Sequence, residues 1–383
     1  MRGRIQSNPS FIAVVDLDAR IRPNHPLRKI KEICDKALQG LNSEFDQAYK
    51  VGGRPSIPPE QLLKGSLLQI IYGIRSERQL CERIEDSLTF RWFLDLPLDQ
   101  EAWVPTVYTH NRDRLLSTEM SRNFLARVVE QAREKGFVSN DHFSVDGTLL
   151  QAWASTKSLQ PMASDSDDDT PTAPPPSEPS SEPSSDDAKP RTGKDILRDF
   201  RGETFSNSTH RSSTDPDSRL ARKSSNTAAK PSYLGNAMME NRSGLVVESD
   251  LRQAAGEGGE TWSALAMLER MEGDHEITLG ADKGYDNKGF VEICRQMNTI
   301  PHVAQNKGPH RQSSVSDEIA ATEGYKTSIR RRKRIEQVFG WMKLSACLRQ
   351  VKIRGKEAVS GLFTLACSAF NLVRMSRLMA VTA

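Results

Sequence analysis

The sequence predicts an α/β protein in two parts: an all-α N-terminal region, followed by a region with a mixed sheet and helices. Three observations support this prediction. Apolar residues recur at helical spacing in the first third of the chain, an alternating β-prone run follows, and the remainder alternates between β-prone and helical segments. A chain of 383 residues is long enough for two or three domains with separate cores.

The N-terminal region, residues 1–118, carries clear helix signals. Pro58 stands at a helix start. Five apolar residues then follow at helical spacing: Leu63, Leu67, Ile70, Ile71 and Ile74. Gly73 ends this helix, and Ser76 is the expected cap of the next one, with Gln79 three residues later as in a capping box. Two helices around a tight turn favour either a helix-turn-helix that binds DNA or a bundle that only packs, and the sequence leaves both open.

The order of elements in the second region predicts its fold. Residues 119–159 contain a β-prone run from His142 to Thr148, which predicts a strand with Asp146 in its C-terminal half. Farther along, "KPSYLGNAMMENRSGLVVESDL" predicts a hairpin, "GETWSALAMLERM" a helix and "ITLGADKGYD" a buried strand that reaches Asp282. A helix, another strand and a helix with Glu336 complete the order, which is that of a ribonuclease-H-like mixed sheet.

Charge is distributed very unevenly along the chain, although the formal net charge is only +3. From Gly324 to the C-terminus there are thirteen Lys and Arg against two acids. Residues 160–198 are rich in Ser, Pro and Asp, and predict a disordered insertion within the region that residues 199–383 complete. This acidic insertion is either a solvated spacer or a mimic of DNA that occupies a basic groove.

Five consecutive cations predict a nucleic-acid surface and leave one acid to explain. They are Arg330, Arg331, Arg332, Lys333 and Arg334. In one continuous helix Arg332, Glu336 and Lys343 fall within a narrow arc. The two cations would then hold phosphates while Glu336 holds a metal ion.

Three carboxylates come from separate elements of the predicted sheet. The first and fourth strands of this fold lie side by side, so Asp146 and Asp282 meet, and Glu336 reaches them from a helix over the sheet. Such a set suits two hard divalent cations that drive phosphodiester transfer. Each piece alone has a simpler explanation: a strand-end turn for Asp146, a solvated loop for Asp282, and a plain nucleic-acid patch for the basic helix.

Cysteine usage and hydropathy limit the setting of the protein. The five cysteines include no CxxC pair, which argues against a disulfide framework and a zinc site and favours the cytoplasm. The N-terminus has no apolar signal sequence, and no run of eighteen apolar residues occurs. We therefore expect no membrane span.

These motifs resemble the DDE transposases of bacterial insertion sequences, specifically the IS-five-like group. "SVDGTLLQAWAS" resembles the block around the first aspartate, "ITLGADKGYDNKGFVE" the second block and "RIEQVFGWMK" the glutamate block. The family signature Tyr-x2-Arg-x3-Glu-x6-Lys is matched by Arg332, Glu336 and Lys343, whereas Ile329 stands at the Tyr position. The resemblance covers nearly the whole chain except the acidic insertion.

The resemblance implies an enzyme that binds the terminal inverted repeats of its own element as double-stranded DNA, cuts the ends and joins them to target DNA. Asp146, Asp282 and Glu336 would bind Mg²⁺, for which Mn²⁺ can substitute, and the basic residues would contact phosphates. A homodimer on DNA is expected, because two ends must be cut together. The alternatives are a metal-dependent nuclease that does not join DNA, and a non-catalytic DNA-binding protein derived from a transposase.

Overall fold

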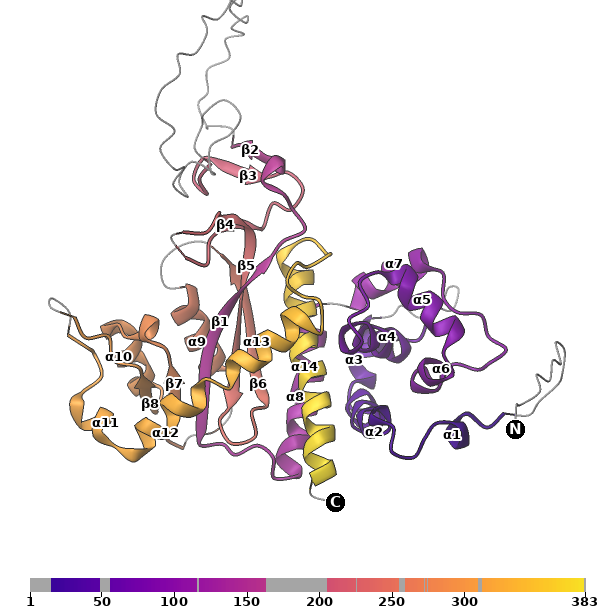
Figure 1. Ribbon diagram of the computed structural model, residues 1–383, viewed down its shortest axis with the longest axis horizontal. Coiled ribbons are helices and arrows are strands. Elements are labelled where there is room, and N and C mark those ends of the chain that lie inside the picture. Colours follow the sequence, from indigo (N-terminus) through magenta and orange to yellow (C-terminus); the bar gives the residue numbers. More distant parts are fainter. Residues whose placement is uncertain are drawn as a thin grey trace, which may run out of the picture.

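The described part of the chain folds into a helical region beside a sheet region (Figure 1). The structure is a computed structural model, which describes residues 15–48, 56–115, 117–162, 205–224, 226–254, 259–271, 273, 275–308 and 312–381.

The N-terminal region is all-helical, as predicted. Its described helices are α1 (Leu17–Arg20), α2 (Pro26–Gln39), α3 (Asn42–Ala48), α4 (Pro59–Ile71), α5 (Glu77–Asp86), α6 (Leu88–Leu94) and α7 (Pro105–Leu115). The predicted turn signals are confirmed: Gly73 follows α4 with φ +60°, and the Ser76 hydroxyl accepts a hydrogen bond from the Gln79 amide at the start of α5.

A mixed sheet forms the second region. Its strands are β1 (His142–Gln151), β4 (Arg219–Ala221), β5 (Lys230–Glu240), β6 (Val246–Gln253), β7 (Ile277–Ala281) and β8 (Thr299–Val303). The order is β6–β5–β1–β7–β8, and the short β4 shares the outer edge of β5 with β6. β1, β5 and β6 pair antiparallel, whereas β1, β7 and β8 pair parallel. This topology confirms the predicted ribonuclease-H-like sheet.

The register of β1 against β7 brings two predicted site residues together. The ladder pairs Phe143 with Leu279 and ends where Ser144 pairs with Gly280. Two residues farther on, the same offset sets Asp146 opposite Asp282. β1 itself continues to Gln151, so Asp146 lies in the middle of a longer strand than predicted. From Val145 up to Gln151, which forms a parallel bridge with Gln350, no strand of the described chain pairs with the β7 side of β1.

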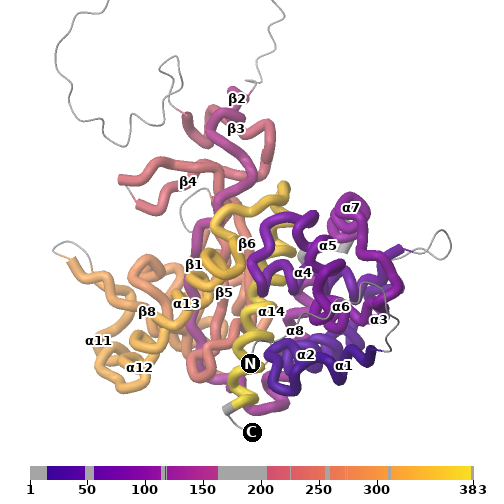
Figure 2. Tube along the Cα trace, turned by 45° about the vertical axis from the view of Figure 1, so that its right-hand side comes forward, coloured from indigo at the N-terminus to yellow at the C-terminus, as the bar shows by residue number. Residues whose placement is uncertain are grey.

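Helices cover both faces of the sheet. They are α8 (Thr118–Glu134), α9 (Gly259–Glu269), α10 (Lys288–Gln296), α11 (Asp317–Ala321), α12 (Glu323–Arg332), α13 (Ile335–Leu344) and α14 (Lys356–Val381). On β5, Leu234 contacts the start of α9, whereas the next residue, Gly235, faces Phe363 of α14. Because neighbouring strand residues face opposite sides, α9 and α14 lie on opposite faces. α2 and α4 lie beside α14 and attach the helical region to it (Figure 2).

α14 is the one helix of the described chain that is long and apolar enough to cross a membrane by length and composition. Of its most apolar window, 72% is buried inside the protein. Asn371 exchanges two hydrogen bonds with the backbone of Val246 in β6. This burial and these contacts favour a core helix over a membrane span.

The first residues of the predicted acidic insertion, residues 160–198, belong to a described strand. Gln160 and Pro161 belong to β2 (Leu159–Pro161), which pairs with β3 (His210–Ser212) in a small separate sheet after the 3-10 turn η1 (Thr156–Ser158). Residues 163–198 of the predicted insertion lie outside the described residues.

Candidate active site

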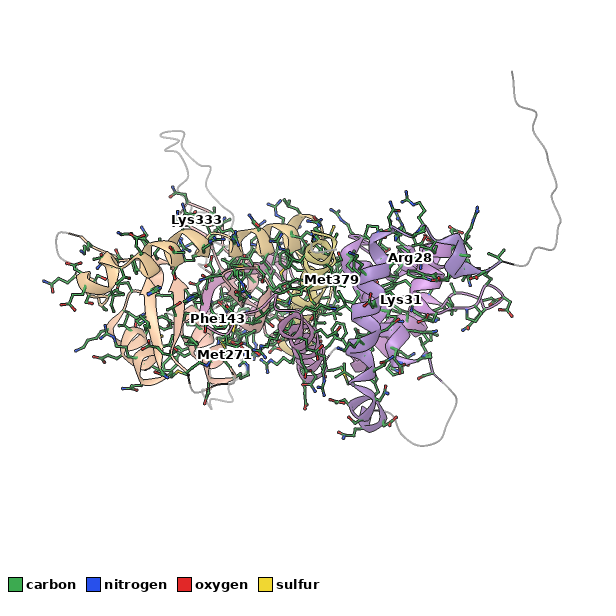
Figure 3. All side chains as sticks on the ribbon, turned by 90° about the horizontal axis from the view of Figure 1, so that it is seen from below. Arg28, Lys31, Phe143, Met271, Lys333 and Met379 are labelled. Carbon is green, nitrogen blue, oxygen red and sulfur yellow. The ribbon has the colours of Figure 1, made fainter. Side chains whose placement is uncertain are left out.

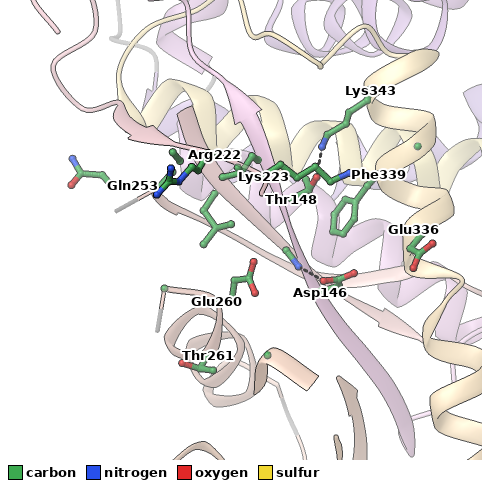
Figure 4. A pocket seen from close by; sticks show the side chains of 18 residues that line it. Asp146, Thr148, Arg222, Lys223, Gln253, Glu260, Thr261, Glu336, Phe339 and Lys343 are labelled. Atoms are coloured by element: carbon green, nitrogen blue, oxygen red, sulfur yellow. Dashed lines mark hydrogen bonds between the residues drawn. The ribbon is translucent and has the colours of Figure 1, made fainter. Parts of the chain in front are cut away.

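A cleft of about 740 Å³ runs along the middle of β1, between α9 on one side and α13 on the other (Figure 4). Its lining includes several acids and the cations Arg222, Lys223 and Lys343. Such an arrangement suits a ligand with negative charge that approaches the acids through a counter-ion.

Asp146 lies at the centre of this cleft, half-buried on β1. Its Oδ1 accepts a hydrogen bond from the Gly147 amide at 2.8 Å. Burial raises the pKa of Asp146, and the charges of Asp282 and Glu336 raise it further, although the Gly147 amide and Arg332 oppose them. Both other predicted acids are therefore near enough to act on the same carboxyl group.

Asp282 and Glu336 approach Asp146 from two different elements. Asp282 directly follows β7 and caps the 3-10 turn η3 (Lys283–Tyr285), where its Oδ1 accepts from the Gly284 amide at 2.7 Å. Glu336 is exposed in the first turn of α13 and lines the cleft. The apolar side of α13 is buried as predicted, by Ile335, Val338, Phe339 and Met342.

The acids do not yet form a finished metal site. Among the described residues, no group of three or more His, Cys, Asp or Glu side chains converges closely enough to hold an ion. Ionised carboxylates around one cleft repel one another, and a divalent cation would offset that repulsion. Carboxylate oxygens are also the donors that hard divalent cations prefer, so this set fits such an ion in chemistry.

The comparisons with known proteins agree with this geometry. The family model "Transposase domain (DUF772)" matches residues 15–114, and the model "Transposase DDE domain" matches residues 205–372. The chain belongs to the DDE transposases. No curated protein sequence matches it. The second match begins after Asp146, so the place of Asp146 in the site of this transposase rests on the β1–β7 register.

Solved structures similar to this transposase include complexes of another transposase. They are "Mos1 transposase paired-end complex with left transposon end" and "Crystal structure of a pre-cleavage Mos1 transpososome", at 10% and 13% identity. The first covers 80% of this chain and 86% of that chain, and the second 90% and 87%. Both TM-scores are 0.19, so the ribonuclease-H-like assignment rests on the strand order alone.

The basic run of the transposase is not one continuous helix, and this prediction was wrong. α12 ends at Arg332 and α13 begins at Ile335, with tight i→i+3 bonds such as Arg334 N–H to Arg331 O between them. At the break, the Arg334 guanidinium donates to the backbone carbonyls of Asn241 and Arg242. This tertiary contact, together with five adjacent like charges, offsets the local preference for a straight helix.

The predicted phosphate-binding residues therefore differ in their surroundings. Arg330, Arg331 and Lys333 are exposed, and Lys333 projects from the surface (Figure 3). Arg332 is half-buried, and its Nε has no hydrogen-bond partner among the described residues. Glu336 and Lys343 still share a face, because they lie seven residues apart within α13. The Lys343 ammonium donates a hydrogen bond to the Thr148 hydroxyl in β1.

Sequence reasoning missed one acid of the cleft, Glu260 in the first turn of α9. In Figure 4, Asp146 lies between Glu260 and Glu336. An acid in the first helical turn is common because it interacts favourably with the helix dipole, so Glu260 gave no separate signal. Only the tertiary structure brings α9 beside the unpaired edge of β1.

Proposed function

We propose that this transposase binds the terminal inverted repeats of its own element, cuts the DNA at their ends and joins the freed ends to target DNA. The observation that carries the proposal is the β1–β7 register, whose offset sets Asp146 opposite Asp282, beside a cleft that Asp146 and Glu336 line together. These acids come from adjacent strands and from a covering helix of a ribonuclease-H-like sheet. The assignment to the IS-five-like group is part of the proposal.

The proposed chemistry is hydrolysis followed by transesterification. Water attacks a phosphorus atom at the element end, the P–O3′ bond breaks, and a 3′ hydroxyl and a 5′ phosphate result. The 3′ hydroxyl then attacks a phosphorus atom of target DNA and expels another 3′ oxygen, so the number of ester bonds is conserved. Two divalent cations, Mg²⁺ or Mn²⁺, would supply activation of the nucleophile and stabilisation of the leaving oxygen when bound.

The residues of this chain have separate roles in that chemistry. Asp146, Asp282 and Glu336 would hold the cations. Lys343, half-buried in the lining of the cleft, would hold a phosphate group beside them. Burial lowers the pKa of Lys343, and the nearby charges of Lys223 and Arg349 lower it further, so three cations crowd one place. A polyanion relieves this repulsion, which supports a DNA backbone as the ligand.

The setting of the reaction follows from the same proposal. Two element ends must be cut together, so we propose a homodimer on DNA. All five cysteines are free thiols, four of them buried, which supports a reducing, cytoplasmic location.

A strand-transfer assay tests the function. The substrate is a duplex that carries the inverted repeat found beside the gene, either intact or already cut at its 3′ end, mixed with a target plasmid and Mg²⁺. Nicking of the intact duplex and joining of the pre-cut end to the plasmid are expected. Cleavage without joining would instead favour a nuclease, and binding without cleavage in either Mg²⁺ or Mn²⁺ would contradict an enzymatic role.

A further inference from the structure

A glycine makes room for the unpredicted acid of the cleft. A Cβ placed on Gly147, the residue after Asp146 in β1, would lie 2.6 Å from Oδ1 of Asn236 on the neighbouring β5. It would also lie 2.9 Å from Oε1 and 3.1 Å from Cγ of Glu260. The φ of Gly147 is not in the left-handed region, so the backbone itself does not require glycine there. The missing side chain therefore leaves room for both the Asn236 amide and the Glu260 carboxylate beside β1.

The end of β7 explains how Glu260 can share a cleft with acids of the opposite face. Side chains alternate along β1, so Gly147 faces α9 while Asp146 and Thr148 face α13. β7 stops pairing at Ser144 of β1, and the unpaired edge between Ser144 and the bridge at Gln151 connects the two sides. The cleft passes around this edge, so Glu260 lines it together with Asp146 and Glu336 (Figure 4).

Two buried polar atoms beside these acids have no hydrogen-bond partner among the described residues. One is the hydroxyl of Tyr285, whose side chain is fully buried, and the other is Oδ1 of Asn236. Burial raises the pKa of Tyr285, and the charges of Glu260, Asp146 and Asp282 raise it further, in that order of size. An unpaired buried polar group costs about 1–3 kcal/mol, so such groups are normally satisfied by a ligand or by water.

A purely structural role for Glu260 in stabilising the start of α9 does not explain why its carboxylate lies against β1. The dipole of α9 favours an acid in its first turn, but any exposed direction of the side chain would serve that purpose. Instead the carboxylate is partly buried, and burial first, then Asp146 and Asp282, raise its pKa.

We propose that Glu260 is a fourth carboxylate of the divalent-cation site, which reaches the ions from the α9 side of β1 through the gap left by Gly147. This inference rests on the proposed function of the cleft. Four carboxylates carry a charge of −4, which two divalent cations neutralise, whereas three carboxylates would leave a surplus of +1. Water that accompanies the cations would supply a hydrogen-bond partner for the Tyr285 hydroxyl.

A titration of the DNA-free, full-length protein with Mn²⁺ tests the proposal, with the free ion followed by electron paramagnetic resonance. Glu260→Gln should weaken Mn²⁺ binding by about 10- to 100-fold, the range seen when groups that support a metal site are removed. Glu269→Gln is the matched control, because Glu269 is an exposed acid at the other end of α9, and it should bind as the parent does. Glu260→Asp keeps the negative charge but places it one methylene farther from the ions. Its Mn²⁺ affinity should therefore lie between those of Glu260→Gln and Glu269→Gln.

Thermal melting in the absence of metal checks that each variant is folded. If Glu260→Gln does not fold, Glu260→Asp is used in its place. Parental Mn²⁺ binding in the folded Glu260 variant would overturn the inference. If Asp146→Asn abolished binding while the Glu260 variant retained it, only the fourth carboxylate would be refuted. If the parent bound no Mn²⁺, the proposed function of the cleft would fail as well.

Discussion

Gly73 tests how the helical region is attached to the helix that carries Glu336. It follows α4 with φ +60°, and a Cβ placed on it would lie 2.4 Å from the carbonyl oxygen of Ser345, just after α13. Cys347 of the same connection donates a hydrogen bond from Sγ to the Gly73 carbonyl at 3.5 Å. Gly73→Ala must therefore adopt a left-handed conformation and also displace the segment between α13 and α14.

The two costs can be separated with a control glycine. Gly136, at the end of α8, has φ +69° and no atom within 4 Å of its Cβ position. Gly136→Ala should therefore lose only the free energy that a left-handed conformation costs a residue with a side chain, about 1–2 kcal/mol. The Ser345 oxygen is backbone and cannot rotate away, so Gly73→Ala should lose about 2 kcal/mol more than the control, as strained contacts in packed regions do.

Urea denaturation of both variants measures this difference as a change in the free energy of unfolding. We expect a lower midpoint for Gly73→Ala than for Gly136→Ala, with little change in the slope of either transition. Equal losses of stability would refute the close approach of the α4–α5 turn to the α13–α14 connection.

Three further results are expected. Burial, then His142, lowers the pKa of His302 from 6.5 to about 4, so the unfolded chain binds more protons between these pH values. Stability should therefore fall by up to about 3 kcal/mol as pH drops from 6.5 to 4, and His302→Asn should flatten this part of a urea-stability profile. Lys343→Ala and Arg332→Ala should each reduce the slope of log K against log salt by about one unit in DNA-binding titrations, and unchanged slopes in both would contradict the phosphate contacts. Removal of residues 164–187 should leave the melting temperature unchanged, because that composition contributes no core, and tighter DNA binding after the deletion would favour the DNA mimic over the spacer.

Local patterns predicted the order of the elements and the two neighbouring strands that carry Asp146 and precede Asp282. The β-prone alternation around Asp146 and the buried run before Asp282 identify their strands, and the fold class then makes those strands neighbours. The turn at Gly73 and the cap at Ser76 are also local, because each depends on a few adjacent residues. These features needed no knowledge of distant contacts.

The remaining features depend on tertiary contacts that local patterns do not carry. The break between α12 and α13 involves the contact of Arg334 with a turn 92 and 93 residues earlier in the chain, at Arg242 and Asn241. The approach of Glu260 needs both a glycine on β1 and the early end of β7. Neither residue type nor spacing signals these coincidences, so the straight basic helix was predicted wrongly and Glu260 was missed.

Charge removal at the three acids tests the catalytic assignment most directly. Asp146→Asn, Asp282→Asn and Glu336→Gln keep the shape of each side chain but lose the charge that a hard cation needs. Glu292→Gln, at an exposed acid of α10, is the control. The measurement is Mg²⁺-dependent nicking of an inverted-repeat duplex, beside a gel-shift titration. Each of the three variants should lose nicking by several orders of magnitude while its DNA affinity holds or rises. Near-parental nicking by any one of them, at equal folded concentration, would contradict its assignment as a metal ligand.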